Sequence, residues 1–215
     1  MTAGTSAQRC QELALRQHGV IARSQALAQG MSASAIDRRM HSGEWLRLLP
    51  GTYALRGSPA SFMRRATAAY LWAGKGTLLS HDTSGILFDL DGVSTRTISV
   101  SSPRRLSSPR VVVHRRPTNV LPSKKIEVVR VTSIEQTLLD LGGNLGSERL
   151  ELALDSALRQ GPHSLRSPHP APSDLRWAGR GGIDSLGADP QDARALSPPD
   201  RQHPRGRAIE AGAQF

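Results

Sequence analysis

Apolar side chains near the start of the chain recur at helical spacing in three short segments, each followed by a glycine. The spacing predicts a first helix over residues 6–18, a second over 23–29 and a third over 32–42. A serine at or near the start of each segment can cap the helix, and the glycine after it can end it. The side chains expected to face inward are Cys10, Leu13, Ala14, Ala26, Leu27, Ile36 and Met40.

A hairpin pattern follows the third helix directly. Residues 45–49 are extended in character, Pro50-Gly51 is a turn pair, and residues 52–55 form the return strand. Val20-Ile21 is a short extended segment before the second helix. Two short helices joined by a glycine-containing turn are typical of the helix-turn-helix, and a hairpin placed after them makes it winged.

The pattern changes after residue 57, where helical and strand-like segments alternate. This alternation predicts a compact mixed α+β domain over residues 58–160. Its expected helices are residues 62–73, 80–88, 133–143 and 147–159, and its expected strands are 78–79, 97–100, 111–114 and 126–131.

A third region begins near Gly161, where the composition shifts abruptly. Residues 161–215 hold eight of the fourteen prolines, and their few large apolar residues show no period. Such a segment buries too little apolar surface to offset the entropy of ordering it, which predicts a disordered tail. Because a well-formed helical pattern gives way to Pro, Arg and Gly, we also hypothesise a frameshift at about residue 161. The predicted fold class is therefore α+β, with a winged helix-turn-helix over 1–57, a companion domain over 58–160 and a disordered tail over 161–215.

Charge narrows the class of partner. The chain has a formal net charge of +10, of which residues 1–57 contribute +4, residues 58–160 contribute +5 and residues 161–215 contribute +1. A basic excess in the predicted folded regions favours a polyanionic partner, with double-stranded DNA the usual one. The alternative is ordinary surface charge from an arginine-rich coding bias.

Cysteine content and hydropathy favour a reducing, cytoplasmic compartment. Cys10 is the only cysteine, which excludes an intramolecular disulfide and a thiolate-rich metal site. No stretch has the pattern of a secretory signal, and no apolar run approaches the roughly 18–20 residues needed to span a bilayer. We therefore expect no membrane partner.

The third helix carries the strongest chemical signal. With Ile36 and Met40 facing inward, Arg38 is the best candidate for a base contact, and Arg39 is expected to reach phosphate or to pack its stem. Asp37 argues against this surface, because a carboxylate repels phosphate unless it accepts from cytosine or pairs with an arginine. The expected DNA-binding residues are Ser32, Ser34, Ala35, Arg38, Arg39, His41, Arg47 and Arg56. The alternative is a plain three-helix packing unit with a solvated charged face.

Three other clusters are weaker. Ser80, His81 and Asp82 are consecutive and cannot converge as a catalytic triad, so a helix cap explains them better. Asp89 and Asp91 lack the spacing of a calcium loop. His114 is best explained as a polar strand end. We expect no catalytic residue, no metal and no cofactor.

Several runs together resemble the AbiEi family of antitoxins from type IV toxin–antitoxin (abortive infection) systems. In the N-terminal winged helix these runs are QHGVIARSQAL at 17–27, GMSASAI at 30–36 and LPGTYAL at 49–55. LSHDTSG at 79–85 and TSIEQTLLDL at 132–141 look like the linking domain of actinobacterial members. The resemblance implies transcriptional autorepression of a toxin operon through the winged helix, without enzymatic activity.

Two alternatives differ from that expectation. Many relatives with this arrangement continue into a nuclease-like domain with an acidic metal site, and no such motif follows residue 161. The chain could therefore be a truncated remnant of a DNA-processing protein that has lost its endonuclease-like domain. A protein-interaction module is the other alternative, since winged helices also bind proteins.

Overall fold

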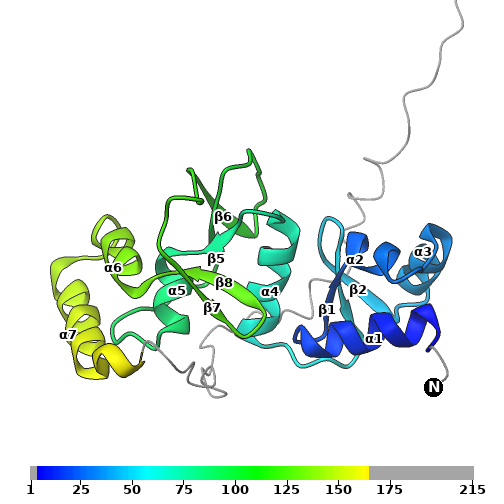
Figure 1. Ribbon diagram of the computed structural model, residues 1–215, viewed down its shortest axis with the longest axis horizontal. Helices are drawn as coiled ribbons and strands as arrows, with labels where there is room; N and C mark the ends of the chain where they lie inside the picture. Colours follow the sequence, from blue (N-terminus) through cyan, green and yellow to red (C-terminus); the bar gives the residue numbers. More distant parts are fainter. Residues whose placement is uncertain (1–3, 165–215) are drawn as a thin grey trace, which may run out of the picture. The chain divides into compact units, whose positions relative to one another are not determined.

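The N-terminal region is a three-helix unit closed by a three-stranded antiparallel sheet. The computed structural model describes residues 4–164 (Figure 1). The sheet has the order β1-β3-β2, because Val20–Ala22 pairs with the hairpin strand Thr52–Leu55. The elements are α1 (Ser6–Arg16), β1 (Val20–Ala22), α2 (Arg23–Ala28), α3 (Ala33–His41), β2 (Trp45–Leu49) and β3 (Thr52–Leu55). The predicted winged helix-turn-helix is confirmed in its order and nearly in its bounds.

Helix caps in this region differ from the predicted ones at two of the three helices. Thr5, not Ser6, caps α1, in a capping box with Gln8. No side chain caps α2; instead the Gln25 side chain accepts from the backbone N–H of Ala22 at 3.0 Å. Ser32 caps α3 as expected, accepting from the backbone N–H of Ala35.

The core of the winged helix contains all but one of the predicted inward residues. Cys10, Ala14, Ala26 and Ile36 have no exposed surface, and Leu13 and Met40 pack against the same cluster. Leu27 is the exception, because 46% of its surface is exposed. Helix α2 has only six residues, and Ala26 occupies its inner side.

The companion region is a five-stranded mixed sheet with helices, as predicted for residues 58–160. The strand order is β6-β5-β4-β8-β7, with β5 parallel to β6 and β4 parallel to β8. Its strands are β4 (Leu78–Leu79), β5 (Ile98–Ser102), β6 (Val111–Arg115), β7 (Ser123–Ile126) and β8 (Val129–Thr132). Its helices are α4 (Phe62–Ala73), α5 (His81–Leu87), α6 (Ile134–Gly142) and α7 (Ser147–Ser164).

The single strand predicted over residues 126–131 is wrong. These residues are the turn and flanks of a hairpin, in which Ile126 pairs with Val129. Glu127 turns the chain with a φ of 49°, a left-handed conformation that favours glycine and asparagine. Helix α7 extends to Ser164 but is interrupted by a non-helical kink at Gly161, and the tail boundary at residue 161 stays a prediction. The remainder of the predicted tail, and with it the hypothesised frameshift product, lies outside the described residues.

Helix α4 contacts strands of both sheets (Figure 1). Met63, Ala66 and Ala69 on this helix share one buried cluster with Val20 and Leu49 of the N-terminal sheet and with strands β4 to β8. Small alanines on the helix let strands approach closely on more than one side. The division at residue 57 stays a prediction. None of the helices in residues 4–164 is both long and apolar enough to cross a membrane.

Candidate nucleic-acid interface

Helix α3 presents the polar face expected of a recognition helix. Ile36 has no exposed surface, and Met40 packs against the core of the winged helix. The remaining turns of the helix expose Ser34, Arg38 and His41. Small residues at its start leave room for close approach to a groove. The helix therefore offers both hydroxyl and guanidinium donors on its solvent side.

Asp37 is neutralised by an arginine from the preceding helix. The Asp37 carboxylate accepts from Arg23 Nη1 at 2.8 Å and from Nη2 at 3.5 Å. The hydrogen bond from Arg23 lowers the pKa of Asp37, and the bond to Asp37 raises the pKa of Arg23. Arg23 also donates to the Tyr53 hydroxyl at 3.4 Å, so the pair connects α3 to the first residue of α2 and to strand β3.

This contact answers the objection that the sequence raised against the helix. A carboxylate paired with an arginine no longer presents a full negative charge to an approaching phosphate. An arginine pair was one of the two conditions under which Asp37 was expected to be compatible with DNA. Nothing in the spacing identified Arg23, which lies fourteen residues earlier.

The predicted site residues divide into free and engaged groups. Arg38, Arg47 and Arg56 are exposed and form no ion pair within residues 4–164. Arg47 lies on strand β2, where its backbone pairs with Tyr53. The Arg56 guanidinium lies beside Gly43, at the turn between α3 and the wing. These three arginines are the ones available to a ligand.

The engaged group consists of side chains that already bind their own helix. Ser32 caps α3 and its hydroxyl lies 3.1 Å from that of Ser34. Arg39 is half-buried, donates to the carbonyl of Ala35 at 3.4 Å and lies 3.5 Å from Glu44. His41 Nδ1 lies 2.7 Å from the carbonyl oxygen of Asp37. The Arg39 guanidinium is therefore held by its own helix and by Glu44, and both of its predicted roles stay predictions.

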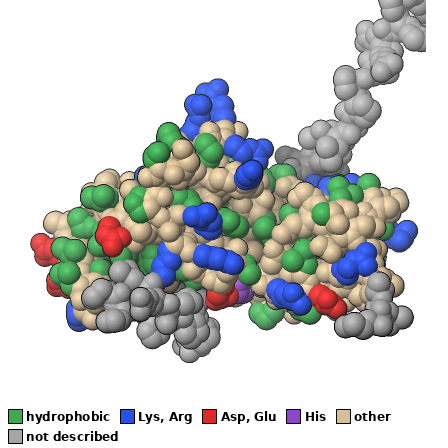
Figure 2. All heavy atoms as spheres, in the orientation of Figure 1, with side chains coloured by type: hydrophobic (Ala, Val, Ile, Leu, Met, Phe, Trp, Pro, Cys, Tyr) green, Lys and Arg blue, Asp and Glu red, His purple; other side chains and the backbone are tan. Residues whose placement is uncertain are grey.

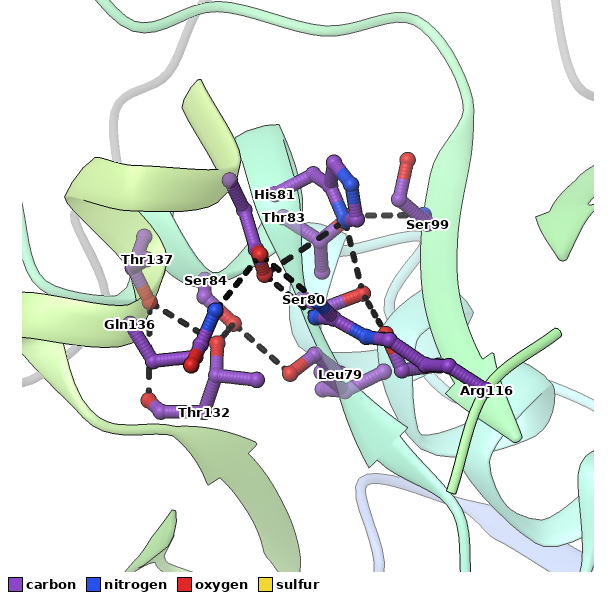
Figure 3. A network of polar contacts seen from close by, with 12 residues as sticks. Leu79, Ser80, His81, Thr83, Ser84, Ser99, Arg116, Thr132, Gln136 and Thr137 are labelled. Carbon is purple, nitrogen blue, oxygen red and sulfur yellow. Dashed lines mark hydrogen bonds and ion pairs between the residues drawn. The ribbon is translucent and has the colours of Figure 1, made fainter. Parts of the chain in front are cut away.

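A buried polar network in the companion region was not predicted (Figure 3). Its centre is Asp140, on α6, which accepts from Arg116 at 2.8 and 2.5 Å and from Gln136 at 2.8 Å. His81 Nδ1 lies 3.7 Å from the same carboxylate, and the ring of His81 stacks on that of His114 at 3.5 Å. His114 is thus more than the polar strand end expected from sequence.

Ionisation in this network is set by burial and by neighbouring charge. Burial first, and then the charge of His114, lower the pKa of His81 to about 4. Burial opposes ionisation of Asp140, but hydrogen bonds from Arg116 and Gln136 outweigh it, so the pKa of Asp140 is lowered. At neutral pH the network holds one arginine, one carboxylate and two uncharged imidazoles.

The geometry around Ser80 does not match a nucleophilic triad. His81 Nδ1 lies 3.0 Å from Ser80 Oγ and is also the atom nearest Asp140, whereas a triad uses the two ring nitrogens separately. Ser80 has no exposed surface and accepts from Ser101 Oγ at 2.9 Å. Its predicted capping bond is also absent from α5. The network connects elements: Thr132 donates to Ser84, and Thr132 and Thr137 share a hydrogen bond.

The other predicted clusters have structural roles. Asp89 and Asp91 follow α5 in a turn, and Asp91 pairs with Arg159 on α7. Within residues 4–164 no three His, Cys, Asp or Glu side chains are grouped to hold a metal ion.

No curated protein matches the chain. Among solved structures, the chain is similar to the RV2827C protein from Mycobacterium tuberculosis, at 17% identity and a TM-score of 0.44 over 76% of this chain and 74% of that one. Residues 8–56 match a family model described as "Transcriptional regulator, AbiEi antitoxin". The resemblance found in the sequence is thereby confirmed for residues 8–56, which are similar to the AbiEi antitoxin family.

Proposed function

We propose that the protein is a DNA-binding transcriptional regulator, and specifically the antitoxin of a type IV toxin–antitoxin system that represses its own operon. The winged helix binds double-stranded DNA, with α3 in the major groove and the β2–β3 hairpin as the wing. The family of residues 8–56 supports a regulator. The finer assignment rests on the surface of α3.

One observation carries this proposal. Arg38 is exposed without an ion-pair partner among the described residues, while the adjacent carboxylate of Asp37 is held by Arg23. An arginine on the exposed face of a recognition helix can donate two hydrogen bonds to the O6 and N7 atoms of guanine. Ser34 lies one turn earlier on the helix and can bond phosphate or a base edge. Arg47 and Arg56 are placed to bind flanking phosphates.

The first experiment selects bound sequences from a random duplex library with the full chain. The selected duplex is then titrated with wild type, Arg38→Ala and Arg56→Ala. If Arg38 reads a base, Arg38→Ala weakens binding by about 1–3 kcal/mol and relaxes preference at one base pair. Arg56→Ala is the matched variant. It should weaken binding to all sequences alike and lower the slope of log affinity against log salt concentration by about 1.

Two results would contradict the proposal. Recovery of no preferred sequence would remove the regulator assignment. Unchanged binding by Arg38→Ala would remove α3 as the reading element. The antitoxin assignment is tested separately, by co-expression with the product of a neighbouring nucleotidyltransferase-like gene. Failure of this chain to restore growth would contradict that part alone.

A further inference from the structure

The topology of the five-stranded sheet brings several basic loops to one end. Strands β5 and β6 are parallel, with Ser102 opposite Arg115, so both carboxyl ends lie at the same end of the sheet. Strand β4 is antiparallel to β5, so the loop that leads into β4 lies there too. Because β8 is parallel to β4, the β7–β8 turn is also at this end.

Contacts confirm that these segments are neighbours. Arg104 Nη1 donates to the carbonyl of Ala73 at 3.1 Å, which connects the β5–β6 loop to the end of α4. The Thr118 hydroxyl donates to the carbonyl of Gly76, from the segment after β6 to the loop before β4. The loops at this end are therefore held together by hydrogen bonds.

Five exposed cations lie in these loops or close to the strand ends that adjoin them, and we call them the sheet-end cluster. They are Lys75, Arg104, Arg105, Arg115 and Lys125. None of them pairs with a carboxylate within residues 4–164. The nearby acidic residue in the β7–β8 turn, Glu127, lies 2.9 Å from His18 instead.

The charge of the surrounding sequence is strongly asymmetric. Residues 96–130 contain nine Lys and Arg against one acidic residue, whereas residues 131–160 contain two against five. Figure 2 shows basic side chains over the sheet and its loops, and acidic ones toward the α6–α7 end as well as along the lower edge of this face. Concentrated like charge opposes folding by self-repulsion, so an unpaired cluster of this kind is explained best by a polyanion that it binds.

We propose that the sheet-end cluster is a second DNA-binding surface, which contacts phosphates of the same duplex beyond the segment bound by the winged helix. The inference rests on the proposed function, because a duplex held by the winged helix has a high effective concentration at this domain. The sheet spans four interstrand steps of about 4.8 Å, or about 19 Å. A duplex carries one charge per roughly 1.7 Å, so several phosphates lie within that span. Three of the five cations are arginines, whose planar fork suits phosphate.

The test compares two triple variants with the same change in net charge. Arg105→Gln/Arg115→Gln/Lys125→Gln removes three members of the cluster. The matched control, Arg96→Gln/Arg149→Gln/Arg159→Gln, removes one cation from the segment before β5 and two from α7. Both are titrated by fluorescence anisotropy against the selected sequence in a duplex of about 12 base pairs and in one of about 30, over a range of salt. Circular dichroism checks that each variant is folded.

For the wild type, we expect tighter binding and a steeper salt dependence on the longer duplex. The cluster variant should lose about tenfold in affinity for the longer duplex, with the salt slope lowered by about 2–3, and should bind the short duplex as the wild type does. The control should stay within about twofold of the wild type on both duplexes.

The outcomes separate this inference from the proposed function. If the wild type binds both duplexes equally and the two triple variants behave alike, the second surface is overturned while the winged-helix assignment stands. If the wild type binds neither duplex, both fail. A cluster-dependent association with vesicles that contain anionic lipid, without any gain from the longer duplex, would assign the cluster to a membrane surface and overturn the inference.

Discussion

Replacing Asp140 by asparagine tests whether the buried network stabilises the companion region. The wild-type carboxylate accepts two hydrogen bonds from Arg116 and one from Gln136, and only 4% of its side chain is exposed. The asparagine amide would keep one acceptor but would turn an N–H group toward a guanidinium. Arg116 would then be left as a partly buried cation without its counter-charge.

The expected loss in the free energy of unfolding depends on how far water can solvate Arg116 in the variant. Breaking a buried ion pair by removing one partner costs about 3–5 kcal/mol. The Arg116 side chain is 26% exposed, so water can recover part of that, and the lower end of about 3 kcal/mol is expected. For a chain of this size the melting temperature should fall by roughly 6–12 °C.

The assay is urea unfolding followed by circular dichroism, with Asp91→Asn as the control. Asp91 also pairs with an arginine, but both side chains are more than half exposed, so its loss should cost about 0–1 kcal/mol. Equal effects of the two substitutions would refute the reasoning. The double variant Asp140→Leu/Arg116→Met should recover most of the stability, because an apolar pair leaves no charge unpaired.

Three further predictions follow from single contacts. Arg23→Gln should weaken duplex binding, since it frees the Asp37 carboxylate, and Arg23→Gln/Asp37→Asn should restore it; titration of the selected duplex checks both. The pKa of His81 is lowered to about 4 in the folded state, so the unfolded state binds more protons between pH 6.5 and 4. The contribution of His81 to the free energy of unfolding should therefore be fully present above pH 6.5 and decline toward pH 4. His81→Phe should flatten this decline in melting temperatures measured over that pH range. Gly19→Ala should cost more than Gly51→Ala in urea unfolding: both have positive φ, but a Cβ at Gly19 would lie 2.3 Å from the Ser58 Cβ, whereas Gly51 faces open space.

The winged helix could be predicted because its signals are local. The apolar face of each helix lies within one segment of six to eleven residues, and a glycine follows each segment. The hairpin turns at Pro50-Gly51. The β7–β8 hairpin could not, because Glu127 adopts a left-handed conformation without the glycine or asparagine that usually marks one. The apolar residues on both sides of this turn together have the pattern of one continuous strand.

The buried network could not be predicted from the sequence for a different reason. Its central hydrogen bonds join Arg116 to Asp140, which are 24 positions apart, and hydrogen-bond partners at that separation leave no periodic trace. What the sequence did contain was the two runs that carry the network, residues 79–85 and 132–141. They resembled a family's linking domain, and the structure shows that they contact each other through Ser84 and Thr132.

Two ion pairs, Arg23–Asp37 and Arg116–Asp140, affect how the positive net charge is presented to a ligand. Arg23 pairs with the exposed Asp37 carboxylate on α3, and Arg116 pairs with the buried Asp140 carboxylate on α6. Each pair removes one positive and one negative charge, so the formal charge of +10 is unchanged. The Asp37 carboxylate on the recognition helix is therefore already paired, while Arg38 and the sheet-end cluster have no ion-pair partner within residues 4–164. On α3 an approaching phosphate meets Arg38 beside a carboxylate whose charge Arg23 already balances.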